Sequence, residues 1–144
     1  MVEREYQIIA RNYDFAGRAS SNIKRTLKAL SLDNYLIKKV CSASYEAEIN
    51  VVIHSVGGYA LFNMDEEKIV LDFYDDGPGI FDIELAMEEG FSTANELDHA
   101  NGFGAGMGLL NIKRSADIME LTSEPDETHM KLTFYLKESP NDLL

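Results

Sequence analysis

The 144-residue sequence contains one cysteine, three prolines and no tryptophan, and none of its apolar runs is long. Because one cysteine cannot form an internal disulfide, and Cys41 lies in an apolar helical pattern with no neighbouring cysteine or metal-spaced histidine, we expect a buried, unreactive thiol. No apolar run approaches the roughly 20 residues of a membrane-spanning helix, and no signal-peptide apolar region follows the charged residues 1–5. We therefore expect a cytosolic protein without a membrane partner.

Positive charge is also scarce. The chain has 13 Lys and Arg against 25 Asp and Glu, which gives a formal net charge of -12. Such a charge repels nucleic acid over distances near a Debye length, so nucleic-acid binding is disfavoured. A nucleotide polyphosphate is repelled as well. A site for one would therefore need a divalent cation and backbone N–H groups rather than bulk positive charge.

The length and the apolar periodicity predict a single α+β domain over residues 1–144. The predicted strands are 4–11, 59–63, 68–74, 118–122 and 128–137, and the predicted helices are 17–32, 33–56 and 107–115. The second and third strands form an antiparallel hairpin because a short turn separates them. Residues from about 80 to 107 show no strong pattern beyond a short helix at 83–89, which is typical of a functional lid or of disorder.

Polar residues interrupt the apolar stripe of the predicted helix 33–56. Glu46 and Asn50 are four residues apart and share one helix face, and His54 continues the same line. Burying such groups without partners costs about 1 to 3 kcal/mol each. A carboxylate can act as a general base, and an amide oxygen is a neutral ligand suited to Mg²⁺. The alternative is that this stripe simply faces solvent.

A carboxylate followed by glycines marks the end of the predicted strand 68–74. Asp75 is followed by Gly77 and Gly79. Glycine allows a flat ligand to approach the backbone closely, and an aspartate can accept a hydrogen bond from an exocyclic amino group such as that of adenine. A simple turn with a capping aspartate is the alternative for such a segment taken alone.

A second glycine cluster precedes the predicted helix 107–115. Gly102, Gly104, Gly106 and Gly108 alternate there, and the free N–H groups of a helix N-terminus suit phosphate. The segment 75–112 contains no Lys or Arg, so phosphate charge would be met by backbone dipoles and by a cation at Asn50. Neither the P-loop pattern nor the dinucleotide-binding glycine pattern is present.

In this order, the blocks resemble the GHKL family of ATP-binding domains, and within it most closely the bacterial anti-sigma-factor serine/threonine kinases. Glu46–His54 is similar to the N box, Asp75–Gly79 to the first glycine box, Gly104–Gly108 to the second, and Thr128 to the adenine-side threonine. The resemblance implies a two-layer α/β sandwich with a mixed, mostly antiparallel sheet and helices on one face. Mg·ATP would lie between the helix of Glu46 and the lid.

The resemblance also implies individual roles. Glu46 would be the catalytic residue that activates the attacking hydroxyl or water, and Asn50 would be the Mg²⁺ ligand. The residues implied to bind the nucleotide are Asn50, Asp75, Gly77, Gly79, Ile80, Gly104, Gly106, Met107, Gly108, Leu109 and Thr128. Ile53 stands where histidine kinases commonly carry Lys or Arg, which favours the anti-sigma branch. Glu127 departs from the family pattern, in which Gly usually precedes the threonine.

The implied function is transfer of the ATP γ-phosphate to a serine of a small regulatory partner, either an anti-anti-sigma-like domain or a sigma factor. One alternative is a nucleotide-dependent regulator that binds its partner without phosphotransfer, which the lack of basic residues in the lid favours. Another is a detached catalytic subunit of a histidine kinase. A homodimer is a further option.

Overall fold

The computed structural model describes residues 2–9, 14, 16–54, 57–75, 108–124 and 127–136. Within these residues the strands are β1 (Val2–Ile8), β2 (Gly58–Met64), β3 (Lys68–Asp75), β4 (Ile118–Glu124) and β5 (Glu127–Tyr135). The helices described are α1 (Arg18–Ala29), α2 (Asn34–His54) and α5 (Gly108–Ser115). The predicted short helix at 83–89 lies outside the described residues.

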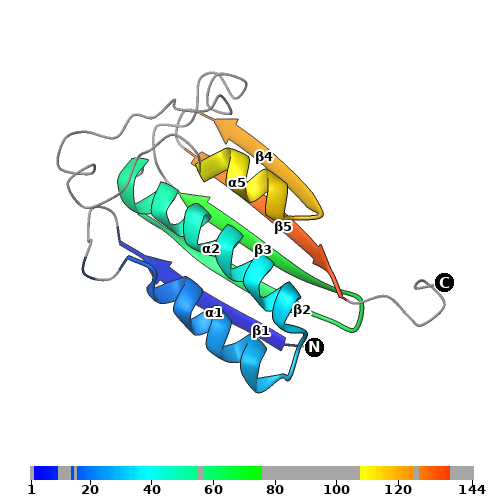
Figure 1. Cartoon of the computed structure of the whole chain (residues 1–144). Coiled ribbons are helices and arrows are strands. Elements are labelled where there is room, and N and C mark those ends of the chain that lie inside the picture. Colours follow the sequence, from blue (N-terminus) through cyan, green and yellow to red (C-terminus); the bar gives the residue numbers. More distant parts are fainter. Residues whose placement is uncertain are drawn as a thin grey trace.

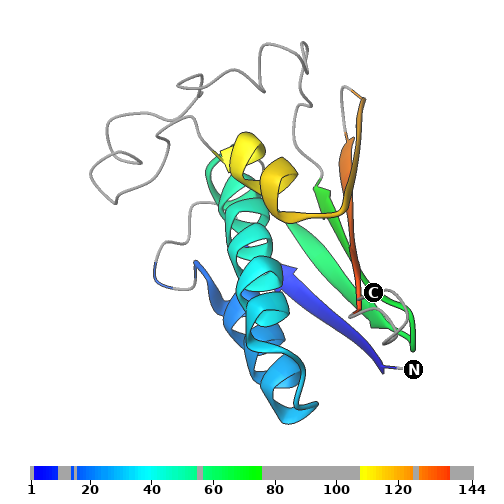
Figure 2. The ribbon, with the colours of Figure 1, turned by 45° about the vertical axis from the view of Figure 1, so that its right-hand side comes forward.

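The strands form one sheet in the order β1-β2-β3-β5-β4, and each described pairing is antiparallel. The helices α1, α2 and α5 cover one face of this sheet, and α2 lies between the other two (Figures 1 and 2). The predicted two-layer α/β sandwich, with a mostly antiparallel sheet and helices on one face, is confirmed.

The core lies between α2 and the covered face of the sheet. Its largest fully buried side chains come from both layers and include Phe62, Phe134, Ile23, Leu27, Ile69, Leu71, Ile112 and Leu132. The predicted inward stripe of α2 is confirmed, because Leu36, Ile37, Val40, Ala43, Ala47 and Val51 are all buried. Apolar burial of this kind is the dominant favourable term in folding. Cys41 is only partly buried, contrary to the prediction, and burial raises the pKa of its thiol.

Local hydrogen bonds stabilise the C-terminus of α1 and the N-terminus of α2, on either side of the loop that connects the two helices. Asp33, the first residue of the predicted helix 33–56, caps α2, because its carboxylate oxygen accepts a hydrogen bond from the N–H of Leu36 at 3.1 Å. The predicted end of α1 at residue 32 is wrong. Ser31 has a φ of 58°, and the N–H groups of Ser31 and Leu32 donate to the carbonyls of Lys28 and Leu27 at 3.0 and 3.4 Å. This is a Schellman motif with serine where glycine is usual.

No helix in the described part of the chain is long and apolar enough to span a membrane.

Gly58 begins β2 at a point where two strands approach each other closely. It pairs with Asp75, and a Cβ added to it would lie 1.9 Å from the carbonyl oxygen of Tyr74 and 2.9 Å from the Cα of Asp75. Both of these atoms belong to the backbone of β3 and cannot rotate away. A side chain at position 58 would therefore force β2 and β3 apart at the end of the sheet that carries Asp75.

We expect Gly58→Ala to lower the free energy of unfolding by about 2 to 3 kcal/mol, because overpacking against backbone cannot be relieved by a change of rotamer. Urea denaturation followed by circular dichroism measures the change. Asn63→Ala is the matched control, since Asn63 lies near the other end of the same strand and is only partly buried. Equal unfolding midpoints for the two variants would contradict the prediction.

Candidate functional site

The C-terminal half of α2 presents acidic residues to both of its neighbouring helices. Glu46 lies on the side of α5, whose Asn111 side chain influences the pKa of Glu46, and Glu48 accepts hydrogen bonds from the backbone of α1. Successive residues of an α-helix are about 100° apart, so residues two apart point in nearly opposite directions. The two carboxylates therefore face different neighbouring helices, although only one residue separates them in the sequence.

Glu46 is partly buried. Burial raises the pKa of its carboxyl group because the charged form is desolvated, and the hydrogen bond from the Asn111 side chain acts in the opposite direction. A carboxylate with a raised pKa and an oriented donor beside it is typical of a general base. Asn111 could not be identified from the sequence, because nothing in the local pattern of residues 107–115 connects it with Glu46.

Glu48 is the second residue that the sequence analysis did not assign. Its side chain is fully enclosed, with 2% of the residue exposed, and its two carboxylate oxygens accept hydrogen bonds from the N–H groups of Gly17, Ala19 and Ser20 at 3.0, 3.1 and 2.9 Å. Helix α1 has no side-chain cap of its own and no acidic residue in its first turn. Glu48 thus caps α1 from another helix and complements its dipole. The missing cap is the signal in the sequence that could have indicated this contact.

Asp75 and Thr128, the two residues predicted to contact adenine, are direct neighbours across β3 and β5. Both point to the face of the sheet that the helices cover, because Phe73 and Met130, two residues further along each strand, are buried in the core. Thr128 is 8% exposed and Asp75 is partly buried. The structure therefore brings together two residues that lie far apart in the sequence.

The remaining parts of the predicted site meet at the same end of the sandwich. Helix α2 ends at His54, shortly before β2 begins opposite the end of β3, and α5 begins at Gly108. The end of α2, the end of β3 and the start of α5 lie together at the upper left of Figure 1. Asn50 is partly buried on α2, and Leu109 on α5 is partly buried against the core.

Other predicted site residues cannot be placed. Gly77, Gly79, Ile80, Gly104, Gly106 and Met107 lie outside the described residues, as does the predicted lid at about 80–107. The side chain of His54 is also outside the described part, although its backbone ends α2. Their predicted contacts with a nucleotide stay predictions.

The donor chemistry of the described residues suits a magnesium–nucleotide complex. Within the described ranges, no group of three or more His, Cys, Asp or Glu side chains is arranged to hold a metal ion. The predicted metal ligand, Asn50, offers a neutral amide oxygen instead. Mg²⁺ keeps several waters and is commonly bound through one or two protein oxygens together with phosphate oxygens, so this residue fits a metal ion that arrives with its nucleotide.

The face of the sheet opposite the helices carries a stack of rings behind Asp75 and Thr128. The rings of Tyr59 and Tyr74 stack with centroids 5.0 Å apart, and those of Tyr74 and His129 with centroids 4.2 Å apart. The Nε2 of His129 also lies 2.7 Å from a carboxylate oxygen of Asp72. These contacts join the strands β2, β3 and β5.

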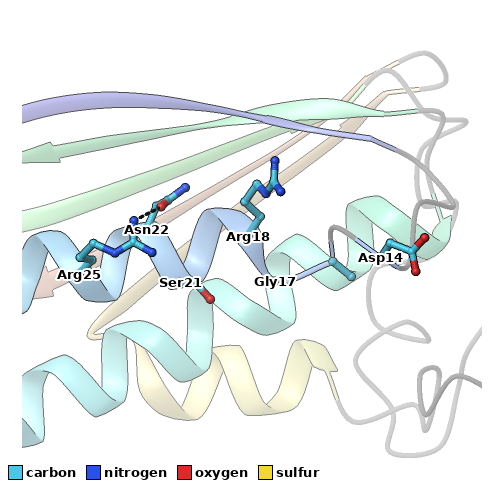
Figure 3. A pocket seen from close by; sticks show the side chains of 7 residues that line it. Asp14, Gly17, Arg18, Ser21, Asn22 and Arg25 are labelled. Atoms are coloured by element: carbon cyan, nitrogen blue, oxygen red, sulfur yellow. Dashed lines mark hydrogen bonds between the residues drawn. The ribbon is translucent and has the colours of Figure 1, made fainter.

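A shallow hollow of about 540 Å³ lies beside the start of α1 (Figure 3). It is lined by Asp14, Ala16, Gly17, Arg18, Ser21, Asn22 and Arg25. Arg18 and Arg25 belong to the basic face of α1 and are both exposed, so this face is solvated surface with a shallow recess. Because Glu48 already accepts the N–H groups of the first turn, an anion in the hollow would be bound by arginine side chains rather than by the helix N-terminus.

No protein-family model matches the chain. The chain is 33% identical over 110 residues to the anti-sigma F factor of Bacillus cytotoxicus, and this match covers 72% of the chain and 70% of the relative. Among solved structures, the RsbU and RsbW domains of Rv1364c from Mycobacterium tuberculosis match 96% of the chain with a TM-score of 0.66 and 14% identity. That match spans 34% of the mycobacterial chain.

A second solved structure, the mycobacterial sensor histidine kinase MprB, matches 96% of the chain and 100% of its own length, with a TM-score of 0.54 and 17% identity. At such identities, these two likenesses show the fold alone. The match to the anti-sigma F factor differs from these two, because it is a match of amino-acid sequence at 33% identity.

We expect Glu48→Gln to lower the free energy of unfolding by about 2 kcal/mol or more. The glutamine amide group would replace one acceptor oxygen with a donor that faces backbone N–H groups, and it would remove the charge that complements the dipole of α1. Thermal and urea denaturation measure the loss. Glu66→Gln is the matched control, because Glu66 is exposed in the turn between β2 and β3. The assignment of Glu48 is wrong if the two variants are equally stable.

In contrast to Glu48, we expect the ionised carboxylate of Glu46 to lower the stability of the folded state. Because burial raises the folded pKa of Glu46 above the ordinary glutamate value of 4.5, the folded state binds more protons than the unfolded state in the intervening pH range. Stability therefore falls as the pH rises through that range, and the ionised carboxylate destabilises the fold at neutral pH. We expect Glu46→Gln to be more stable than the wild type at pH 7, with a difference that shrinks towards pH 4.5.

Urea denaturation at several pH values tests this prediction. Removal of any one negative charge reduces self-repulsion in a protein of net charge -12, so Glu120→Gln, at an exposed position on β4, is needed as the matched control. A Glu46→Gln protein that is no more stable than Glu120→Gln at pH 7 would contradict the prediction.

Proposed function

The chain belongs to the anti-sigma F factor family, a branch of the GHKL ATP-binding domains, and from that premise we propose that it is a Mg·ATP-dependent serine/threonine protein kinase. Its substrate would be a serine on a small regulatory partner, an anti-anti-sigma-like domain or a sigma factor. The observation that carries the proposal is that Asp75 and Thr128, which are far apart in the sequence, pair across β3 and β5 at the end of the sheet near which α2, the helix of Glu46, ends.

The described side chains supply the polar groups that such a reaction needs. The carboxylate of Asp75 would accept a hydrogen bond from the adenine amino group, and the hydroxyl of Thr128 lies directly opposite it on the next strand. The amide oxygen of Asn50 would hold Mg²⁺, which supplies positive charge to the phosphates when it is bound. Residues 75–112 contain no basic residue that could supply this charge instead.

Glu46 would act as the general base. Its carboxylate accepts the proton of the attacking serine hydroxyl while the serine oxygen forms a bond to the γ-phosphorus and the bond from that phosphorus to the bridging oxygen breaks, which leaves ADP. Partial burial suits this role, because a raised pKa makes the carboxylate a better proton acceptor.

The hollow beside α1 is the surface on which we expect part of the partner to bind. Its lining carries the positive charges of Arg18 and Arg25 and the negative charge of Asp14, in a chain of net charge -12. Charge complementarity favours an acidic segment of the partner. Glu48 connects this surface with the site, because its carboxylate holds the first turn of α1 and its helix carries Glu46 and Asn50.

The absence of Lys and Arg between residues 75 and 112 favours a second candidate function, a regulator that binds ATP and captures its partner without phosphotransfer. Phosphoryl transfer depends on electrostatic stabilisation of the transferred group, and a basic residue near the terminal phosphate would provide it. In this candidate, Glu46 would be dispensable for partner capture.

Incubation with Mg²⁺ and radiolabelled ATP should phosphorylate a candidate anti-anti-sigma-like domain or sigma factor on serine. Glu46→Gln should lower the rate by about a hundredfold or more, because it removes the base, while ATP binding measured by calorimetry persists. Glu120→Gln is the matched control and should retain activity. Nucleotide-dependent capture without labelling, unaffected by Glu46→Gln, would support the second candidate. If ATP gave no binding heat in the presence of Mg²⁺, both candidates would be wrong.

A further inference from the structure

Three rings lie in one row on the face of the sheet opposite the helices. Tyr59, Tyr74 and His129 occupy directly paired positions of β2, β3 and β5. The rings of Tyr59 and Tyr74 are 22° from parallel and those of Tyr74 and His129 are 6° from parallel, with centroids 5.0 and 4.2 Å apart. Stacked rings attract each other beyond the effect of their buried area. We call these three residues the ring stack, and Tyr74 is its central member.

A hydrogen bond holds one end of the ring stack. The Nε2 of His129 lies 2.7 Å from a carboxylate oxygen of Asp72, and the ring nitrogen is the donor because an ionised carboxylate can only accept. Asp72 is 7% exposed although it lies on the outer face of the sheet, and a buried carboxylate requires a partner of this kind. The ring of His129 is therefore fixed both by stacking on Tyr74 and by its bond to Asp72.

The ring stack lies directly behind the two residues assigned to adenine. Asp75 follows Tyr74 and Thr128 precedes His129, so the two pairs are neighbours along the same ladder. Adjacent residues of a strand point to opposite faces of the sheet, so the rings occupy one face while Asp75 and Thr128 occupy the other. Asp75 is the last residue of β3, which places its pair at the end of the ladder. Strand ends open more readily than strand centres, so contacts at this end determine how firmly the pair is held.

We propose that Tyr74 and His129 are positioning residues that hold Asp75 and Thr128 at the spacing that adenine requires. One planar peptide unit joins Tyr74 to Asp75 and another joins Thr128 to His129, so a shift between the two rings moves Asp75 relative to Thr128. A hydrogen bond from the adenine amino group tolerates little displacement, because it weakens steeply with distance and angle. The rings themselves face away from the nucleotide. This inference rests on the proposed ATP-binding function.

Base discrimination is the property that this arrangement would control. Adenine carries an exocyclic amino group that can donate to Asp75, whereas guanine carries a carbonyl oxygen at the same ring position. A well-placed carboxylate therefore favours ATP over GTP, and a displaced one discriminates less. A general loss of stability acts differently, because a smaller folded fraction weakens the apparent binding of both nucleotides by the same factor.

Tyr74→Leu tests the proposal, because it removes the central ring and keeps an apolar side chain. In calorimetry with Mg²⁺, we expect the Kd for ATP to rise about tenfold and the Kd for GTP to change less than about threefold, since the hydrogen bond to Asp75 is lost. Tyr74→Phe keeps the ring and should retain the wild-type values. Tyr135→Leu is the matched control, because it removes an exposed ring from the same face near the other end of β5.

His129→Gln is a second variant in case Tyr74→Leu does not fold. It removes a ring of the stack while keeping an amide donor for Asp72, and it should lower the preference for ATP over GTP by about threefold or more. A wild-type preference in the folded variants that lack a ring would overturn the proposal. So would a loss in Tyr74→Phe as large as that in Tyr74→Leu.

A measurement without nucleotide distinguishes failure of this inference from failure of the proposed function. Amide hydrogen exchange at residues 74–75 and 128–129 should be about tenfold faster in Tyr74→Leu than in the wild type, Tyr74→Phe or Tyr135→Leu, because the end of the ladder opens more often. Residues 70–71 and 132–133, in the middle of the same ladder, should exchange at the wild-type rate in Tyr74→Leu. If the wild type binds neither nucleotide, the proposed function is wrong, and hydrogen exchange still shows whether the ring stack holds Asp75 and Thr128 together. Unchanged exchange at 74–75 and 128–129 in Tyr74→Leu would overturn the inference.

Discussion

The contact between the Glu48 carboxylate and the first turn of α1 determines how the candidate site is built. A buried carboxylate is tolerated only where hydrogen bonds replace its hydration, and three backbone N–H groups do so here. The contact fixes the rotation of α2 about its own axis. Because Glu46 and Asn50 are each two residues from Glu48, they lie about 200° from it and point away from α1, towards the side of α5. One structural carboxylate thereby orients two side chains of the candidate site.

The two acidic residues Glu46 and Glu48 of α2 differ in how well the protein stabilises their charged forms. Glu48 is satisfied by three donors and connects two helices, whereas burial raises the pKa of Glu46 and the side chain of Asn111 acts in the opposite direction. A carboxylate that was fully satisfied would be a poor base, because each hydrogen bond to the charged form lowers its affinity for a proton. The incomplete stabilisation of Glu46 would therefore suit the proposed role as proton acceptor, at some cost to the fold.

Much of the fold could be predicted from the sequence because its signals are local. The apolar stripe of α2, its cap at Asp33 and the hairpin of β2 and β3 each depend on residues close together in the chain. The end of α1 could not be predicted, because Ser31 takes a left-handed conformation in which glycine is the usual residue.

The contacts that build the site could be predicted only in part. Local patterns do not show that Glu48 reaches the N-terminus of α1 or that Asn111 influences the pKa of Glu46, because these pairs are far apart in the sequence. Asp75 and Thr128 were assigned to one ligand only through the resemblance to a family, and no spacing in the chain indicates that they face each other across two strands. Long-range pairing of this kind is decided by tertiary packing.

The sheet provides a physical reason why that pairing is well defined. Side chains alternate between the two faces of a strand, so the register that places Asp75 opposite Thr128 on the covered face also places Tyr74 opposite His129 on the other face. A slip of one residue would expose the core side chains of β5 and break the ring stack and the 2.7 Å contact of His129 with Asp72. The apolar core and the outer polar contacts therefore favour the same register, and the position of Thr128 opposite Asp75 follows from both.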